Sequence, residues 1–446
     1  MATAIPGSSV RYILRLISAF LRRFKALIIL SIVFGAAAFF VIRFVVPSFL
    51  AQTSVSIGLT GRYNAGNLPD FIQEMIGDGL TKIDDAGQVE PNLAVSWETP
   101  DKGKTWIFKL KKGVSWQDGK PVNATSISYQ FSDVQSTNLD ENTLVFKLQN
   151  PYSAFPTVVS KPVFKKGLLG TGEWKVKKLS LFGSYVDRIT LENTNGERLV
   201  YKFYPTEERT KLAFELGEIN QIKGILNAEP FNSWPKVKIT KNIERGEYVG
   251  IFLNTTDKTL SEKNLRQALS YAINKDKLPG KRAVSPISES SWAYNPQVKP
   301  YSYDPDKARD MISNLPKDQT DNLSINLTTS PVLLKEAEKV TKDWEAVGVK
   351  TNIQVTPGLP SDYQAFLIIF DMPVDPDQYS IWHSTQSGSS IVKYQNPRID
   401  KLLEDGRTQI NLEERRKIYL DFQRFLVEDS PAIFLYYPET FTIGRN

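Results

Sequence analysis

The tryptophan-rich segment 92–119 restricts the fold of this 446-residue chain more than any other feature. Three tryptophans are almost evenly spaced along it: Trp97, Trp106 and Trp116. From Trp106 to Leu110, large apolar side chains alternate with other residues, which places them on one face of a strand. Asp118-Gly119 lies between apolar stretches and is a strong turn signal. The segment therefore predicts a small antiparallel sheet closed by tight turns.

The length predicts two or three domains, because one hydrophobic core rarely serves so long a chain. The sequence contains no cysteine and a single histidine, His383. This excludes thiol catalysis, disulfides, zinc ribbons, histidine-cluster metal sites and lipidation through an N-terminal cysteine. We therefore expect no cofactor and no bound metal, and we interpret His383 as structural.

The positive charge of the chain is concentrated at its N-terminus. The whole sequence has 55 basic and 49 acidic residues, and residues 1–50 hold six of the basic residues and no acidic ones: Arg11, Arg15, Arg22, Arg23, Lys25 and Arg43. The remainder thus carries 55 − 6 = 49 basic residues against 49 acidic ones. A neutral body gives no electrostatic basis for a nucleic-acid partner.

An uncharged apolar stretch runs from Ala26 to Ile42, directly after the basic segment. As a helix it would be roughly 26 Å long, close to the hydrocarbon thickness of a bilayer. We predict a basic cytoplasmic tail over 1–25 and one transmembrane anchor over 26–48 in the cell membrane. Since basic residues stay on the cytoplasmic side, the body would lie outside the cytoplasm, in the periplasm or on the outer face.

The alternative is a cleaved signal peptide, which also has a basic start and an apolar middle. The apolar stretch exceeds the usual length of roughly 7 to 15 residues. The sequence Phe49-Leu50-Ala51 also has a bulky residue where a cleavage site needs a small one. Both observations favour the uncleaved anchor.

Helical and strand patterns alternate through the rest of the chain, which indicates a mixed α/β protein. Asp304 and Pro305 predict a capped helix start, and Gly348 a helix end. The predicted helices are 124–131, 207–216, 260–273, 332–347 and 414–428. The predicted strands are 142–148, 248–254, 323–328, 350–355, 366–371 and 430–437.

Several short motifs occur in an order that resembles the peptide- and nickel-type extracytoplasmic solute-binding proteins, family 5. They are Asn92-Leu-Ala-Val-Ser-Trp97, Gly170-Thr-Gly172, Leu265-Arg-Gln-Ala-Leu-Ser-Tyr-Ala-Ile273 and Tyr394-Gln-Asn-Pro397. The resemblance covers about residues 55 to 440. It implies a two-lobed clamp like the type II periplasmic binding proteins, preceded here by the transmembrane helix.

The resemblance also implies a division of the body into lobes. We predict lobe I over 51–245, lobe II over 246–424 and a C-terminal strand that returns to lobe I over 425–446. The family usually has a longer helical insertion between the elements predicted at 124–131 and 142–148. We therefore expect a reduced small subdomain, about residues 70–165.

Five residues are candidates for contact with a ligand. Peptide-binding relatives capture the α-amino group of the ligand with one aspartate, and by position Asp371 is the candidate here; the alternative is that it caps the following turn. Tyr379, Trp382 and Trp292 could line a pocket or pack in the core. Arg62 could pair with a carboxylate or remain a solvated surface residue.

These observations predict a membrane-anchored, extracytoplasmic and monomeric receptor that binds peptides by closure of its lobes and delivers them to ABC transporter permeases. Nickel-binding relatives make a metal complex a weaker alternative for the solute. The second interpretation is a membrane-tethered scaffold or sensor that keeps the fold without transport. An enzyme is disfavoured, because three acids in one turn (Asp371, Asp375 and Asp377) do not place an acid and a base across a substrate.

Overall fold

The computed structural model describes residues 8–40, 54–316, 323–386 and 391–445. Helix α1 (Ser8–Phe40) is bent, with non-helical backbone angles at Phe24. No single helix among the described residues is long and apolar enough to cross a bilayer. The helix bends by 55° between the segments Ile17–Leu27 and Ile29–Phe40, and only the two segments together are long and apolar enough for a membrane span. The predicted tail and anchor also include residues 1–7 and 41–48, which lie outside the described residues.

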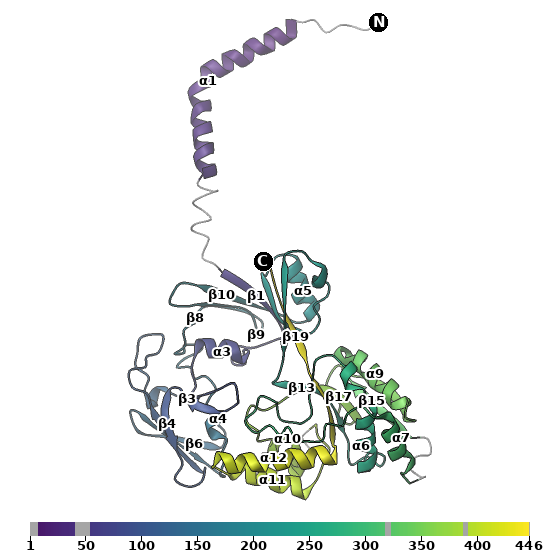
Figure 1. The fold of residues 1–446 in the computed structure, drawn as a ribbon. Coiled ribbons are helices and arrows are strands. Elements are labelled where there is room, and N and C mark those ends of the chain that lie inside the picture. The colour runs from purple at the N-terminus through teal and green to yellow at the C-terminus, as the bar shows by residue number, and fades with distance from the viewer. Residues whose placement is uncertain (1–7, 41–53, 317–322, 387–390, 446) are drawn as a thin grey trace, which may run out of the picture.

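A seven-stranded sheet forms the first half of the body (Figure 1). Its central strand β1 pairs in parallel with β10 and β11, and the outer pairings are antiparallel. In spatial order the strands are β12 (Val237–Ile243), β19 (Glu439–Arg445), β11 (Gln221–Ile225), β1 (Ser54–Thr60), β10 (Arg198–Tyr204), β9 (Tyr185–Glu192) and β8 (Lys175–Phe182).

Helices cover both faces of this sheet. Helix α3 (Asp70–Ile76) buries Ile72 and Ile76 against one face, and α5 (Glu207–Glu215) buries Phe214 against the other. A Cβ at Gly58 of β1 would lie 2.3 Å from the side chain of Ile219. A larger residue at this position would therefore require the Ile219 side chain to shift.

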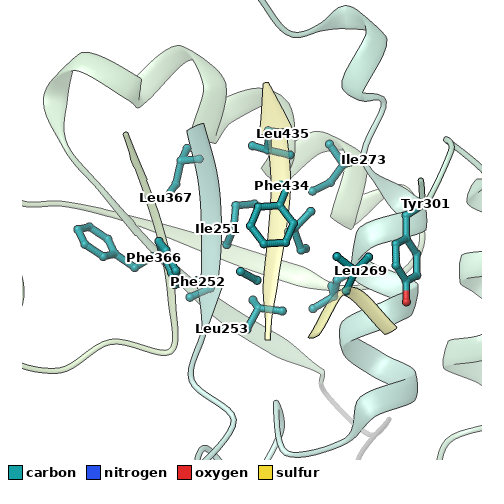
Figure 2. Packing of buried hydrophobic residues seen from close by; sticks show 14 of the residues in the cluster. Ile251, Phe252, Leu253, Leu269, Ile273, Tyr301, Phe366, Leu367, Phe434 and Leu435 are labelled. Carbon is teal, nitrogen blue, oxygen red and sulfur yellow. The ribbon is translucent and has the colours of Figure 1, made fainter. Parts of the chain in front are cut away.

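A six-stranded sheet forms the second half. Its strands, in spatial order, are β14 (Lys281–Arg282), β18 (Ala432–Tyr437), β13 (Glu247–Leu253), β17 (Ala365–Asp371), β15 (Ser324–Thr329) and β16 (Lys350–Val355). Its α-helices are α6 (Lys263–Ala272), α7 (Pro305–Ser313), α9 (Leu334–Glu345), α10 (Tyr379–Trp382), α11 (Pro397–Thr408) and α12 (Leu412–Asp429). Figure 2 shows Leu367, Ile251 and Leu435 side by side on three neighbouring strands of the buried core.

Local signals in this half are confirmed. The Asp304 side chain accepts a hydrogen bond from the backbone N–H of Lys307 and caps α7, with Pro305 in the first turn. Strands β15 and β16 pair in parallel on either side of α9 in the chain, as the predicted strand–helix–strand unit requires. Gly348 has φ +91°, a left-handed conformation suited to the chain reversal after α9.

The predicted antiparallel sheet is present, and the tryptophan-rich segment contributes two of its four strands. Its strands are β4 (Ala94–Glu98), β5 (Thr105–Leu110), β7 (Thr143–Leu148) and β6 (Val134–Asp140), next to a hairpin of β2 (Thr81–Ile83) and β3 (Val89–Pro91) and the short helix α4 (Phe155–Val158). Trp106, Phe108 and Leu110 are all buried on one face. The backbone N–H of Gly119 donates to the carbonyl of Trp116, which closes the predicted turn.

The predicted helix 124–131 is wrong. Only Ala124–Ser126 form a single 3-10 turn, capped by the side chain of Asn123. The chain then continues without helix, and the Tyr129 hydroxyl donates to the carbonyl of Val159, while its ring packs against Phe146. These contacts hold the segment along the sheet, and β6 follows as an almost fully exposed strand.

The chain passes between the two large sheets twice, at adjacent places. It first crosses at residues 244–246, between β12 and β13, and it returns at Pro438, between β18 and β19. The backbone N–H of Glu244 donates to the carbonyl of Pro438 over 2.9 Å, so the two crossings are in contact. The segment 425–446 is therefore shared: β18 lies in the six-stranded sheet and β19 in the seven-stranded sheet.

Candidate functional site

Asp371 ends β17 beside the two crossings. It lies opposite Glu247 of β13 in the strand register, and the two side chains are hydrogen-bonded. Burial and the negative charge of Asp371 raise the pKa of Glu247 to about 7. Asp371 itself is exposed. The structure thus presents a pair of carboxyl groups, one of them exposed, at the junction of the sheets.

The two acids that follow Asp371 are engaged with arginines. Asp375 receives hydrogen bonds from both terminal nitrogens of Arg415 on α12, at 2.8 and 2.5 Å. Asp377 lies 3.3 Å from Nε of Arg407 on α11. Burial raises the pKa of Asp377, and the neighbouring Arg407 opposes that rise. These carboxylates therefore hold the loop after β17 against α11 and α12.

Two of the predicted aromatic residues lie just beyond this loop. Trp382 is only 1% exposed, donates from its indole N–H to Gln378 Oε1 over 2.7 Å, and packs against Phe252. Trp382 is therefore a core residue in this structure, which is the second of the two roles considered for it from the sequence. Tyr379 is half-buried and its ring stacks on that of His383, with centroids 4.0 Å apart.

His383 is buried, and its Nε2 lies 3.3 Å from Glu404 Oε1. Within the part of the chain that the structure describes, there is no group of three or more histidine, cysteine or acidic residues that could hold a metal ion. The contacts of His383 are those of a structural residue.

Trp292 lies at a cavity of about 450 Å³ between the second half of the body and the subdomain formed by strands β2 to β7 and helix α4. Its backbone N–H donates to the carbonyl of Ala86, which joins the two parts directly. The subdomain contributes Trp97, Trp106 and Thr157 to the wall, and the second half contributes Trp292, Asp375 and Arg415. This hollow is walled from both sides of an interface, as ligand sites between domains commonly are.

The subdomain also contacts the last turns of α11. The backbone N–H of Ser153 donates to the carbonyl of Arg407 over 2.8 Å, and its hydroxyl to that of Gly406 over 3.2 Å. The Arg407 guanidinium lies over the rings of Tyr152 (4.9 Å) and Tyr379 (4.5 Å). Polar and cation–π contacts thus close the interface beside the cavity.

The sequence-based prediction missed Arg407, Arg415 and Ser153. Arg415 had a detectable signal, because it shares the helical face of Tyr419, Phe422 and Leu426, which are all buried. A charged residue on an apolar face predicts a buried partner of opposite charge. Arg407 and Ser153 carry no comparable pattern.

Arg62 lies elsewhere, on the loop after β1. It is exposed, and its guanidinium lies 5.6 Å from the centre of the Tyr185 ring, at a groove of about 480 Å³. The structure therefore places Arg62 and Trp292 in two different hollows and Asp371 beside the crossings.

Two sheets joined by adjacent crossings, with a cavity between a subdomain and the second sheet, have the architecture expected of a two-lobed binding protein. A comparison with protein families agrees: the profile of bacterial extracellular solute-binding proteins, family 5, matches residues 88–390. The chain belongs to this family, whose members are the solute-binding proteins of ABC transporters.

Among curated relatives, the oligopeptide-binding protein AppA of Bacillus subtilis is 24% identical over 84% of this chain and 83% of its own. The dipeptide-binding protein of Escherichia coli is 23% identical over 80% and 83%. Among solved structures, NikZ from Campylobacter jejuni in complex with Ni(L-His) has a TM-score of 0.71 at 23% identity, covering 89% of this chain and 94% of NikZ. AppA in complex with a nonapeptide has a TM-score of 0.67 at 21% identity, with coverage of 88% and 94%. These matches confirm the predicted mixed α/β fold of the type II periplasmic-binding-protein kind.

Proposed function

We propose that this protein is the membrane-anchored, extracytoplasmic receptor of an ABC importer and that it binds peptides by hinged closure of two lobes. Family membership carries this proposal. The adjacent crossings at residues 244–246 and Pro438 support a hinge, because few backbone torsions there can reorient one sheet against the other. We place lobe I at 51–245 and lobe II at 246–424; the last segment, 425–446, first adds β18 to lobe II and then returns to lobe I as β19.

Peptides are the favoured solute for two reasons. Two of the relatives described above are peptide-binding proteins by name. In addition, the Asp371–Glu247 pair offers negative charge to a cationic group, and Asp371 is open to solvent. We propose that Asp371 binds the α-amino group of the peptide, with Glu247 as its partner. Tyr379 and Trp292 would contact the rest of the ligand near the interface of the lobes.

The test compares free and N-acetylated peptides of the same sequence by calorimetry on the full chain in detergent. A hydrogen bond between charged groups contributes roughly 1.5–3 kcal/mol, so acetylation or Asp371→Asn should weaken binding by about tenfold to hundredfold. The two changes together should cost no more than either alone, because both remove the same contact.

Asp310→Asn is the matched control, since Asp310 is also exposed in the second half, on α7. It should leave the affinity unchanged. Equal affinity for free and acetylated peptides would exclude the amino-group role of Asp371, and an absence of binding by any peptide would exclude the peptide receptor.

The anchor is a separate part of the proposal. The basic residues before Ala26, the apolar stretch and the bent pair of segments in α1 support a single membrane segment with a cytoplasmic N-terminus. Replacing residues 1–50 by a cleavable signal should release a soluble receptor with unchanged affinity. Loss of binding on release would show that the N-terminal segment is more than a tether.

We propose no catalytic role, because Asp375 and Asp377 are engaged with arginines. The alternative is a tethered scaffold or sensor, in which the contacts of Ser153 with α11 would hold the subdomain against the second half of the body. It predicts that no peptide, sugar or metal complex raises the melting temperature of the protein.

A further inference from the structure

The groove beside Arg62 has the features of a ligand site. It is formed by the loop after β1, the end of β10 and the tip of the β8–β9 hairpin. Since β1 and β10 are parallel neighbours, their carboxyl ends meet at this edge of the sheet. In open α/β sheets, ligands bind in the crevice at the carboxyl ends of the strands. Its volume of about 480 Å³ also lies within the usual range for small-molecule sites.

Arg62 is held at this groove by its neighbours. The N–H of Gly61 donates to the carbonyl of Tyr204 at the end of β10, and the carbonyl of Tyr63 accepts from Val186 of β9. The backbone on both sides of Arg62 is thus hydrogen-bonded to neighbouring strands. Pairing with the sheet therefore fixes the loop position, which lowers the entropic cost of recognition.

Among the described residues, no carboxylate forms an ion pair with Arg62. The contact that the structure records for its guanidinium group is with the Tyr185 ring. Most exposed arginines are simply solvated. What distinguishes this one is the apolar surface around it: Phe182 at the hairpin tip is 82% exposed and Tyr185 is 43% exposed. Large aromatic side chains left open to solvent beside a fixed cation form a surface that suits an amphipathic acid.

We propose that this groove is a binding subsite for a carboxylate attached to an aromatic or aliphatic group, such as the C-terminal residue of an apolar peptide. The inference rests on the proposed receptor function and adds a preference for the acid end of the solute. Arg62 binds the carboxylate, and the rings of Phe182 and Tyr185 contact the apolar group. Asp187 also lines the groove and opposes an anion there.

The probes are N-acetylphenylalanine and N-acetylphenylalaninamide, which differ only in the charge of the C-terminal group. Ligand-observed NMR on the full chain in detergent measures the affinity of each. The acid should bind roughly fivefold more tightly than the amide. This is the gain expected when a solvent-accessible arginine forms a hydrogen-bonded ion pair with a carboxylate. Arg62→Gln should remove this preference, and Asp187→Asn should strengthen binding of the acid.

Two variants separate charge from other effects. Arg209→Gln removes another exposed arginine of the first half, on α5, and should change neither affinity. Phe182→Ser should weaken acid and amide equally and leave their ratio intact. Because both side chains are exposed, neither change disturbs the core.

The proposal is overturned if the wild-type protein fails to bind the acid, if it does not distinguish acid from amide, or if Arg62→Gln keeps the preference. These outcomes are separate from the receptor function. Tight peptide binding without binding of N-acetylphenylalanine would reject the groove and leave the receptor. Binding of this acid at Arg62 without any peptide binding would support the carboxylate subsite and reject the peptide as the solute.

Discussion

Breaking the buried ion pair between Asp375 and Arg415 should destabilise the protein strongly. The two residues are 8% and 5% exposed, and Arg415 also donates from Nε to the carbonyl of Gly406 over 2.9 Å. Asp375→Asn leaves a buried guanidinium opposite a neutral amide. Loss of one partner of such a pair costs about 3–5 kcal/mol, because the remaining charge stays desolvated.

This cost translates into a measurable shift of the melting temperature. The unfolding entropy is about 2.1 cal/mol/K per residue, which amounts to about 0.8 kcal/mol/K for the whole body and about 0.4 kcal/mol/K for the second half alone. A loss of about 3 kcal/mol therefore lowers the melting temperature by about 4 °C if the body unfolds as one unit, and by about 7 °C if the second half unfolds separately.

Differential scanning calorimetry measures the shift, and the same helix supplies the control. Asp421 and Arg424 of α12 form an ion pair of 2.9 Å in which both side chains are more than half exposed. Asp421→Asn should cost less than about 1 kcal/mol. Equal shifts for Asp375→Asn and Asp421→Asn would refute the argument from burial. Arg415→Met in the Asp375→Asn background should restore part of the loss, since it removes the orphaned charge.

Two further predictions concern single positions. In the folded protein, the pKa of Glu247 is raised from its ordinary value near 4.5 to about 7, so protonation of this side chain favours folding. The free energy of unfolding should therefore fall as the pH rises from about 4.5 to about 7. Glu247→Gln should make the free energy of unfolding, measured with denaturant at several pH values, less dependent on pH. A pH dependence that Glu247→Gln leaves unchanged would contradict this assignment. Gly406→Ala should lower the melting temperature although alanine is the better helix former, because the new Cβ would lie 2.8 Å from the Tyr419 ring, and overpacking typically costs 1–3 kcal/mol. A rise in the melting temperature would show that α11 and α12 separate easily.

The sequence predicted those features that local chemistry determines. The alternation from Trp106 to Leu110 placed three side chains in a core, and the cap at Asp304 needs only the next three residues of the chain. The helix predicted at 124–131 failed because the contacts of Tyr129 with distant Val159 and Phe146 override local helix preference.

Long-range contacts also limited the prediction of the site. Asp371 could be identified from its position at the end of a predicted strand. Its partner Glu247 lies 124 residues earlier in the chain, and the two residues come together only because β13 pairs with β17. Trp382 is an aromatic residue beside an acidic loop in the sequence, whereas the fold turns it into the core. Sequence pattern does not reveal which face of such a short helix is covered.

The central claim is that the protein is a receptor for peptides, and thermal unfolding across a peptide concentration series tests it most directly. A ligand that binds only the folded state stabilises it by about 2.7 kcal/mol at one hundred times its dissociation constant, with a logarithmic increase thereafter. The account predicts such a rise in melting temperature for unblocked peptides with the full chain, and a smaller rise with Asp371→Asn. A melting temperature that stays constant up to millimolar concentrations of mixed peptides would contradict it.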